Sequence, residues 1–374
     1  MKTWEFFELI EEKNVLVMTI LILIFLFQFR YNKNNNFGYF DPIGFQFVVS
    51  IFSLSVVLIL YFTNQISSSI TISIILIGFA FYKGLGKLNF PKNNFNYKSI
   101  YTSLIISLIG YVFFYSLMLF NFGLPVFLES RVELTSIDSG SLRFIFRILS
   151  YFRPICLFCS FLLINTSNRW IKFLSWFTIL LIGFESLTSG SKSGLILLVL
   201  YPTLIIRLFQ PELIYNLKKN YKLILTLSLV SIPIVTIILY SNPVILVYRM
   251  IMSGDIYYHV LPNFNFWEHY YNIGNSAIFP SLSKFLGYTE ISTPGFNLGN
   301  DIYDFYYGIK NMGPTRRLPL FLFLNLGIVS GILISFAAGK FLRFTIKILS
   351  HNRVNYIYIF FWLPIFISAT DFLS

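Results

Sequence analysis

The chain has 374 residues, of which 56% are apolar and 12% are charged, and its mean hydropathy is +0.71. This composition excludes an ordinary soluble protein, because too few polar side chains remain to cover a surface in water. The net charge of +12 raises the question of a nucleic-acid partner. The Lys and Arg residues lie mostly in short loops between apolar runs, so their excess reflects membrane topology and no nucleic acid is expected.

Ten apolar runs are long enough to cross a bilayer, for which a helix needs about 20 residues. They predict an all-α integral membrane protein: a polytopic bundle of about ten transmembrane helices in a single domain, residues 1–374. The runs fall near residues 10–29, 42–62, 66–82, 100–121, 143–164, 171–187, 194–209, 222–240, 319–339 and 354–372.

Orientation follows from the loops that are rich in Lys and Arg, which stay in the cytoplasm. Alternation of the runs then places both chain ends outside, together with one large extracytoplasmic loop, residues 241–318. A loop of that length is expected to be ordered against the bundle and functional. The cytoplasmic clusters are Lys83, Lys87, Lys92 and Lys98; Arg169 and Lys172; Arg207, Lys218, Lys219 and Lys222; and Lys340, Arg343, Lys347 and Arg353.

The fifth run begins SLRFIFRILSYFRPICLF and places Arg143, Arg147 and Arg153 within an arc of about 120° on one helix. A guanidinium at membrane depth costs about 2.5–3.5 kcal/mol on insertion scales, so three of them indicate a polar cavity. Snorkelling to the interface explains Arg143 equally well. Arg147 and Arg153 are expected to be functional.

The turn TSGSKSG joins the sixth and seventh runs. Ser191 or Ser193 could cap the helix that follows, and its free N–H groups beside Lys192 would receive an anion such as a pyrophosphate oxygen. The competing interpretation is a tight turn of small residues with a lysine at the interface.

The large loop combines aromatic rings with acidic, basic and imidazole groups, most densely in NFNFWEHYYNIGN. Such rings suit the apolar faces of sugars, although a belt at the membrane interface would contain them too. His259 or His269 could take a proton from a sugar hydroxyl near neutral pH, while a structural role is commoner for a lone histidine. Two histidines without a third ligand predict no zinc site, and Cys156 and Cys159 are interpreted as ordinary buried thiols.

The turn TSGSKSGLILL, the long loop with Arg249 and His269, and its exit NMGPTRRLPLFLFLNLGIVSG resemble the bacterial oligosaccharide repeat-unit polymerases, the Wzy-type O-antigen polymerases. The resemblance covers the architecture of the whole chain, although such enzymes often carry Arg where this chain has Lys192. It implies a cofactor-free, metal-independent glycosyltransferase of the bacterial inner membrane, with its active site facing the periplasm. Such an enzyme moves a growing glycan from undecaprenyl pyrophosphate onto the sugar of an incoming lipid-linked repeat unit.

The resemblance also implies roles for residues and partners. Arginines suit a pyrophosphate leaving group because they offer paired donors and never deprotonate, and a histidine or carboxylate could activate the acceptor hydroxyl. The implied partners are undecaprenyl-pyrophosphate-linked glycans and membrane lipids, with room for a chain-length regulator and a flippase. The expected base is His269, with Glu268, Asp255 or His259 as substitutes, and the expected pyrophosphate ligands are Arg147, Arg153 and Arg249, followed by Arg143, Lys192, Arg316 and Arg317.

Two other functions remain open at this point. A flippase for lipid-linked oligosaccharides would also use arginines within the membrane, but its long outer loop would be unusual. A transferase that uses polyprenyl-phosphate sugars usually carries acidic metal ligands in an early outer loop, and here that loop is the short Thr63–Gln65 connection. A purely structural membrane protein would not need three arginines in one span.

Overall fold

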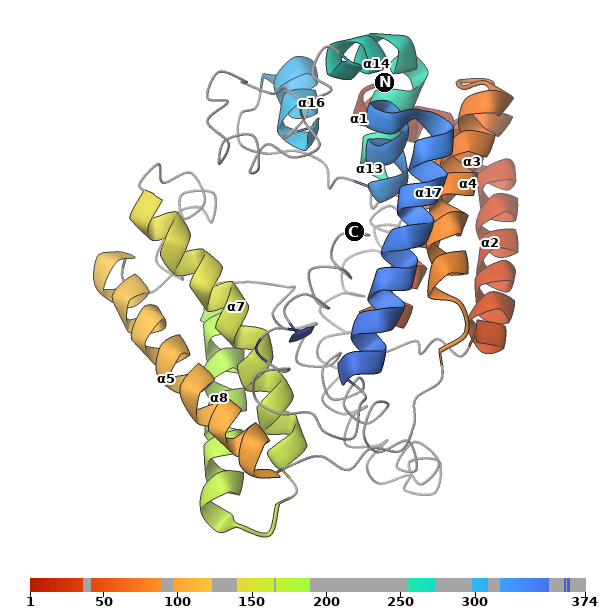
Figure 1. Ribbon diagram of the computed structural model, residues 1–374. Coiled ribbons are helices and arrows are strands. Elements are labelled where there is room, and N and C mark those ends of the chain that lie inside the picture. The colour runs from red at the N-terminus through yellow and green to blue at the C-terminus, as the bar shows by residue number, and fades with distance from the viewer. Residues whose placement is uncertain are drawn as a thin grey trace.

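The computed structural model describes residues 1–35, 42–88, 97–122, 140–164, 166–188, 254–272, 298–308, 317–349, 360 and 362–363. Every regular element in these ranges is a helix (Figure 1). Lipid offers no hydrogen-bond partners to the backbone, and a helix pairs its own backbone N–H and C=O groups. The helices are α1 (Thr3–Glu12), α2 (Asn14–Asn35), α3 (Pro42–Phe62), α4 (Ser68–Leu85), α5 (Tyr97–Phe122), α7 (Gly140–Leu163), α8 (Arg169–Thr188), α13 (Asp255–Val260), η2 (Leu261–Asn263), α14 (Phe264–Asn272), α16 (Leu298–Tyr307) and α17 (Leu318–Leu349).

Four of these helices, α2, α4, α5 and α17, are long and apolar enough to cross a membrane, and α3 and α7 contain shorter apolar stretches. The chain is therefore an α-helical protein with several helices able to span a bilayer. Seven of the predicted runs coincide with helices. The runs at 194–209 and 222–240 lie outside the described residues, as does most of 354–372, so the total of about ten spans stays a prediction.

The described helices pack into two groups (Figure 1). We call the first the α17 group: it contains α2, α3, α4 and α17, with the short helices α1, α13, α14 and α16 around one end. The second, the α7 group, contains α5, α7 and α8. Their packing partners differ: α17 packs mainly on α4, and α7 lies between α5 and α8.

Helix α17 is a hairpin and not one straight rod. Gly327 has φ 69° and ψ −174°, a conformation that interrupts the helix and is open to glycine. A straight helix would separate Pro319 from Ser335 by about 24 Å, yet both line one small cavity, and Leu322 packs on Gly331. The segment 318–326 is therefore a half-helix that folds back on 328–349, whereas the sequence predicted one continuous span over 319–339.

The long arm of the hairpin packs on α4 through small residues. A Cβ on Gly339 would lie 2.0 Å from the carbonyl oxygen of Phe81, and one on Gly84 would lie 2.2 Å from that of Phe336. One turn before the Gly339–Phe81 contact on both helices, the hydroxyl of Ser335 donates to the carbonyl of Ile77 (2.6 Å). Small residues let helix backbones approach closely in lipid, where no hydrophobic force draws them together. These contacts fix the position of the hairpin against α4.

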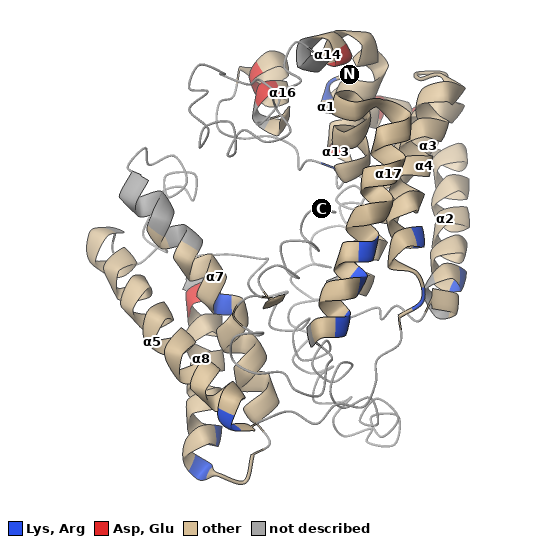
Figure 2. Cartoon of the chain, in the orientation of Figure 1, with Lys and Arg blue, Asp and Glu red and all other residues tan. Residues whose placement is uncertain are grey.

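Charge is distributed unequally along the described helices (Figure 2). Basic residues gather at the end where α4 and α17 finish, among them Lys83, Lys340 and Arg343, and the acidic residues of α14 and α16 lie at the opposite end. The basic end contains residues that the sequence assigned to the cytoplasm. The described helices of the large loop, α13, α14 and α16, lie towards the other end (Figure 1).

Candidate functional site

Helix α13 begins inside the α17 group. Its N-cap, Gly254, lies so close to α3 that a Cβ would come within 2.7 Å of the Ser53 carbonyl oxygen and 2.8 Å of Val56. Ser53 is about halfway along α3, so α13 begins at that level and runs towards α14 (Figure 1). This close approach, which a glycine allows, carries Asp255 into the bundle.

Arg317 stands at the same level, at the start of the half-helix. Its carbonyl accepts the first helical hydrogen bond, from the Phe321 N–H (3.0 Å), and its side chain is buried, with 4% of the residue exposed. A helix start is rich in free N–H groups and favours anions, and a guanidinium adds a permanent positive charge. The local chemistry is that of an anion-binding position.

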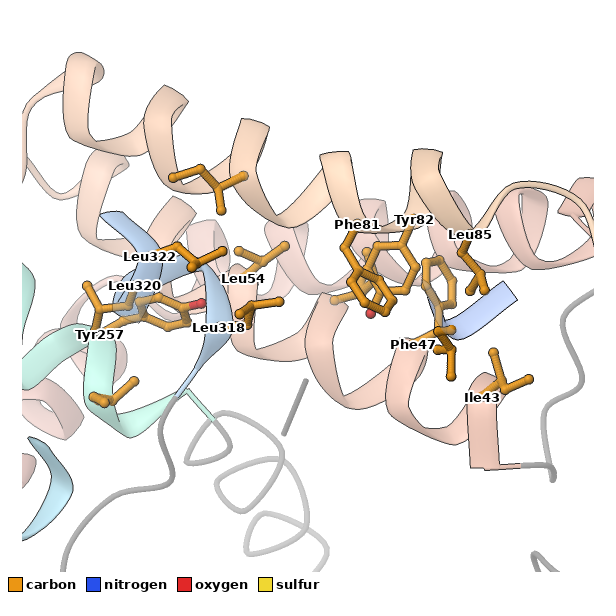
Figure 3. Close-up of a cluster of buried hydrophobic side chains, with 14 of the residues drawn as sticks. Ile43, Phe47, Leu54, Phe81, Tyr82, Leu85, Tyr257, Leu318, Leu320 and Leu322 are labelled. Carbon is orange, nitrogen blue, oxygen red and sulfur yellow. The ribbon is translucent and has the colours of Figure 1, made fainter. Parts of the chain in front are cut away.

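A cavity of about 10 Å³ adjoins Arg317, enough for about one water molecule. Its walls carry hydroxyl groups from four helices, α3, α4, α13 and α17, in addition to apolar side chains. Tyr257, Leu318 and Leu54 all line this cavity, and Figure 3 shows Tyr257 and Leu318 beside Leu54. The polar residues of the lining are Ser50, Ser53, Tyr82, Tyr257, Ser335 and Arg317.

Asp255 has the electrostatics of a group that exchanges protons near neutral pH. The carboxylate accepts a hydrogen bond from the Ile256 N–H (2.9 Å), and 9% of the residue is exposed. Burial raises the pKa of Asp255 to about 7, against the lowering effects of that N–H and of the Arg317 guanidinium. The half-buried Tyr303 of α16 lies within electrostatic range of the same carboxylate. Asp255 and Arg317, far apart in sequence, thus form one candidate site.

His259, one of the predicted bases, lies at the centre of a tyrosine cage. Rings of Tyr258, Tyr303, Tyr306 and Tyr307 surround it at centroid distances of 4.5–5.8 Å. Its Nδ1 donates to the Met1 carbonyl (2.8 Å), and burial lowers its pKa to about 4, although that hydrogen bond acts in the opposite direction. The imidazole is therefore neutral at pH 7 and ties α13 to the first residues of the chain.

The other predicted base has a different setting. His269 is exposed on α14, and its neighbour Glu268 is partly exposed. Helix α14 packs on α17 at the outer end of the group, whereas α13 begins deeper, against Ser53 of α3 (Figure 1). The described residues thus bring Asp255 together with Arg317, and they leave His269 and Glu268 on the surface.

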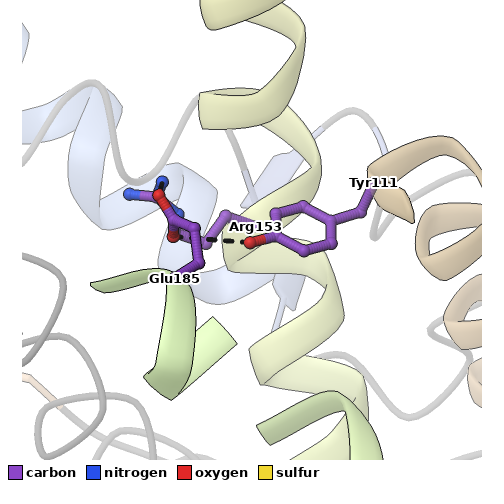
Figure 4. Close-up of polar contacts among 3 residues, drawn as sticks. All are labelled: Tyr111, Arg153 and Glu185. Atoms are coloured by element: carbon purple, nitrogen blue, oxygen red, sulfur yellow. Dashed lines mark hydrogen bonds and ion pairs between the residues drawn. The ribbon is translucent and has the colours of Figure 1, made fainter. Parts of the chain in front are cut away.

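A second buried arginine lies in the α7 group. Arg153 of α7 forms an ion pair with Glu185 of α8, its Nη2 lying 2.5 Å from Oε1, and the hydroxyl of Tyr111 on α5 donates to the other carboxylate oxygen (3.4 Å; Figure 4). The side chains of Arg153 and Glu185 are 20% and 7% exposed. Three helices therefore meet at one carboxylate, which neutralises the arginine that the sequence assigned to pyrophosphate.

The side chains of the remaining predicted pyrophosphate ligands lie outside the described part of the chain. Arg143 and Arg147 lie on α7, as expected, but their side chains are outside the described part of the chain. Arg249, Lys192 and Arg316 also lie outside it. Within the described residues, no group of three or more His, Cys, Asp or Glu could hold a metal ion.

Sequence reasoning missed Glu185, although a signal was present. It is the one acidic residue of the sixth apolar run, and a carboxylate at membrane depth needs a partner of opposite charge. The nearest run with deep arginines is the fifth, so the pair could have been predicted.

Comparison of the chain with protein-family models, with curated proteins and with solved structures found no match.

Proposed function

We propose that this protein polymerises lipid-linked oligosaccharide repeat units, as a metal-independent glycosyltransferase of a bacterial inner membrane with about ten spans. The donor is a glycan on undecaprenyl pyrophosphate, and the acceptor is a sugar hydroxyl of the next lipid-linked unit. The observation that carries the proposal is the electrostatic interaction between buried Asp255 and buried Arg317, each at the start of a helix in the α17 group.

The two side chains suit the two halves of a glycosyl transfer. Asp255, with a pKa of about 7, takes the proton of the acceptor hydroxyl as that oxygen bonds to the anomeric carbon of the donor. The bond from that carbon to the pyrophosphate oxygen breaks, and the leaving group carries the electron pair away. Arg317 stabilises the negative charge that develops there.

Orientation supports a periplasmic site. Lys83, Lys340, Arg343 and Lys347 lie towards the ends at which α4 and α17 finish (Figure 2), and basic loops remain in the cytoplasm. The loop helices α13, α14 and α16 would then face the periplasm. Their tyrosines and acidic residues provide the aromatic faces and acceptors that sugars require.

A second candidate function, a flippase for the same lipid-linked glycans, is favoured by one observation. The half-helix at Arg317 resembles the discontinuous helices whose starting ends hold anionic substrates inside transporters. A polymerase and a flippase would bind the same lipid-linked diphosphate. They differ in whether the glycan is transferred or the whole lipid is moved across the bilayer.

The test uses purified protein and lipid-linked repeat units. Asp255→Asn and Arg317→Lys should each lower polymer formation by about 10² to 10³, because each removes a contact made in the transition state. Asp304→Asn and Arg343→Lys, which change the same groups at exposed or distant positions, should keep normal turnover. Normal ladders from both site variants would refute the proposal. Movement of repeat units across vesicles without polymer would instead favour the flippase.

A further inference from the structure

One face of α17 changes from apolar to basic along its length. Val329, Leu333, Phe336, Lys340 and Arg343 follow one another at intervals of three or four residues, so they lie within an arc of about 80° on the helix. All five are exposed, Val329 at 69% and Leu333 at 64%. This face therefore presents an apolar stripe first and positive charges after it.

The contact with α4 shows where this change falls relative to the membrane. A Cβ on Gly339 would lie 2.8 Å from the backbone nitrogen of Leu85, the last residue of α4 and of its apolar window, Ser68–Leu85. At 1.5 Å per residue, Lys340 and Arg343 lie about 2 and 5–6 Å beyond Gly339. The head-group layer on each side of the hydrocarbon is about 5–8 Å thick. The two basic residues thus fall where phospholipids carry their phosphates.

Basic residues of α4 reach the same place. A Cβ on Gly84 would lie 3.1 Å from the backbone nitrogen of Lys340, so Lys83 and Lys340, both exposed, come from backbone positions that lie side by side. A Cβ on Gly86 would lie 3.1 Å from Nη1 of Arg343, which places this guanidinium against the end of α4. Figure 2 shows basic residues near the ends of both helices. Two helices therefore contribute to one basic surface.

Within the described residues of the α17 group, no acidic residue lies on the helices that form this surface. The Asp and Glu residues of the group belong to α1, α13, α14 and α16, which lie towards the opposite end (Figure 2). Like charges that lie close together repel, and an anion bound among them lowers their energy. The surface is therefore complementary to a negatively charged ligand.

We propose that this face of α17 binds a phospholipid with a negatively charged head group, such as phosphatidylglycerol. Its phosphate lies among Lys83, Lys340 and Arg343, and one acyl chain follows the helix from Phe336 towards Val329. From Lys340 to Val329 the helix extends about 16 Å, close to the half-thickness of the hydrocarbon, about 15 Å. Basic pockets between spans at the cytoplasmic surface bind anionic lipid head groups in this way.

The apolar stripe decides between two sources of the anion. Free phosphate matches the charges alone, whereas a phospholipid matches the charges and the exposed apolar residues next to them. The ligand is a lipid of the surrounding membrane, so the site does not depend on the proposed function.

The first test compares the unchanged protein with two double variants. Lys340→Gln with Arg343→Gln removes two charges of the site, and Arg169→Gln with Lys172→Gln removes two exposed charges at the start of α8. Each purified protein is titrated in detergent with phosphatidylglycerol or phosphatidylcholine, and bound lipid is counted by native mass spectrometry. The site variant should bind phosphatidylglycerol about 30-fold more weakly, or about fivefold for each basic residue removed. The α8 variant should bind it normally, and inorganic phosphate should not displace it.

The second test locates the acyl chain. Phosphatidylglycerol with a photoreactive group halfway along one chain is cross-linked to the protein in phosphatidylcholine vesicles, and the labelled peptides are mapped. Label should concentrate on residues 329–336 in the unchanged protein and in the α8 variant, and the site variant should lose this preference.

Each test has an outcome that overturns the site. Equal affinity of the two double variants for phosphatidylglycerol, or equally tight binding of phosphatidylcholine, would remove the role of the basic residues. Displacement by inorganic phosphate would mean a site for a free anion. Label spread evenly over the exposed faces of α2, α5 and α17 would mean ordinary contact with lipid. None of these measurements uses turnover of repeat units, so failure of the polymerase proposal would leave them unchanged.

Discussion

The two helix groups each bury an arginine, and they surround it with different chemistry. In the α7 group, Arg153 forms an ion pair with Glu185, and Tyr111 completes the carboxylate's contacts. In the α17 group, Arg317 starts a half-helix beside a small polar cavity, with Asp255 close enough to influence its charge. A carboxylate at contact distance makes an arginine structural, because its charge is already compensated. Arg317 instead lies beside a cavity that admits about one water molecule, within electrostatic range of Asp255 and Tyr257.

The largest expected effect tests the structural role of the α7 pair. Arg153→Met should lower the free energy of unfolding by about 3–5 kcal/mol, because it leaves the Glu185 carboxylate buried without its counter-charge. Arg153→Met with Glu185→Leu should recover most of that loss. Thermal unfolding in detergent measures both. If the double variant were as unstable as the single one, the pair would not be the reason for the loss.

The packing of the α17 hairpin comes next. Gly339→Leu should destabilise the protein by about 1–3 kcal/mol or prevent folding, because even its Cβ would lie 2.0 Å from the Phe81 carbonyl. Ala337→Leu, on the exposed side of the same helix, is the matched control. A comparison of melting temperatures decides. Equal melting of the two variants would show that α4 and α17 do not meet as closely as described.

Helix α13, which carries both Asp255 and His259, should show two opposing pH dependences. The pKa of His259 falls from 6.5 to about 4 on folding, so its contribution to stability is present above pH 6.5 and is lost as the pH falls to 4. The pKa of Asp255 rises from 3.8 to about 7, so its contribution is present below pH 3.8 and is lost as the pH rises through 7.

Between pH 4 and 6.5 the contributions of Asp255 and His259 to the free energy of unfolding change in opposite directions. Variants that lack one of the two groups should separate them. Relative to the unchanged protein, Asp255→Asn should gain stability as the pH rises, and His259→Gln should lose it, each by up to about 1.4 kcal/mol per pH unit. Unfolding midpoints across this range provide the measurement. Parallel curves for all three proteins would contradict the burial of both groups.

The smallest expected effect concerns the third member of the α7 cluster. Tyr111→Phe removes one hydrogen bond to Glu185 and should cost about 0.5–1.5 kcal/mol. The same change in the Arg153→Met background should have a different cost, because both groups act on one carboxylate. Additive losses in the double variant would mean that Tyr111 and Arg153 do not share Glu185.

Much of the fold could be predicted from the sequence because hydrophobic run length sets a span directly. The run at 42–62 matches α3 residue for residue, and 171–187 lies within α8. The first run was predicted to begin at residue 10, whereas the structure has α1 end at Glu12 and α2 begin at Asn14. The break at Gly327 was not predicted, since the residues on both sides are apolar and hydropathy does not distinguish a hairpin from a rod.

The candidate site was less predictable, because it depends on contacts between distant segments. Asp255 and Arg317 were both among the candidates, but nothing in the sequence placed them together or ranked them above His269. Their meeting depends on Gly254 against α3 and on the reversal at Gly327. By contrast, Gly331, Ser335 and Gly339, spaced four residues apart, are a visible signal of close helix packing.

The half-helix 318–326 also constrains how the protein is made. Nine residues of helix extend about 13 Å, less than half of the roughly 30 Å of hydrocarbon, so this segment cannot be inserted as a span of its own. Insertion during synthesis must therefore be driven by residues 328–349, and Arg317 must enter afterwards, once α3 and α4 provide polar neighbours. The candidate site would then be the last part of the α17 group to assemble, and damage to α3 or α4 would be seen there first.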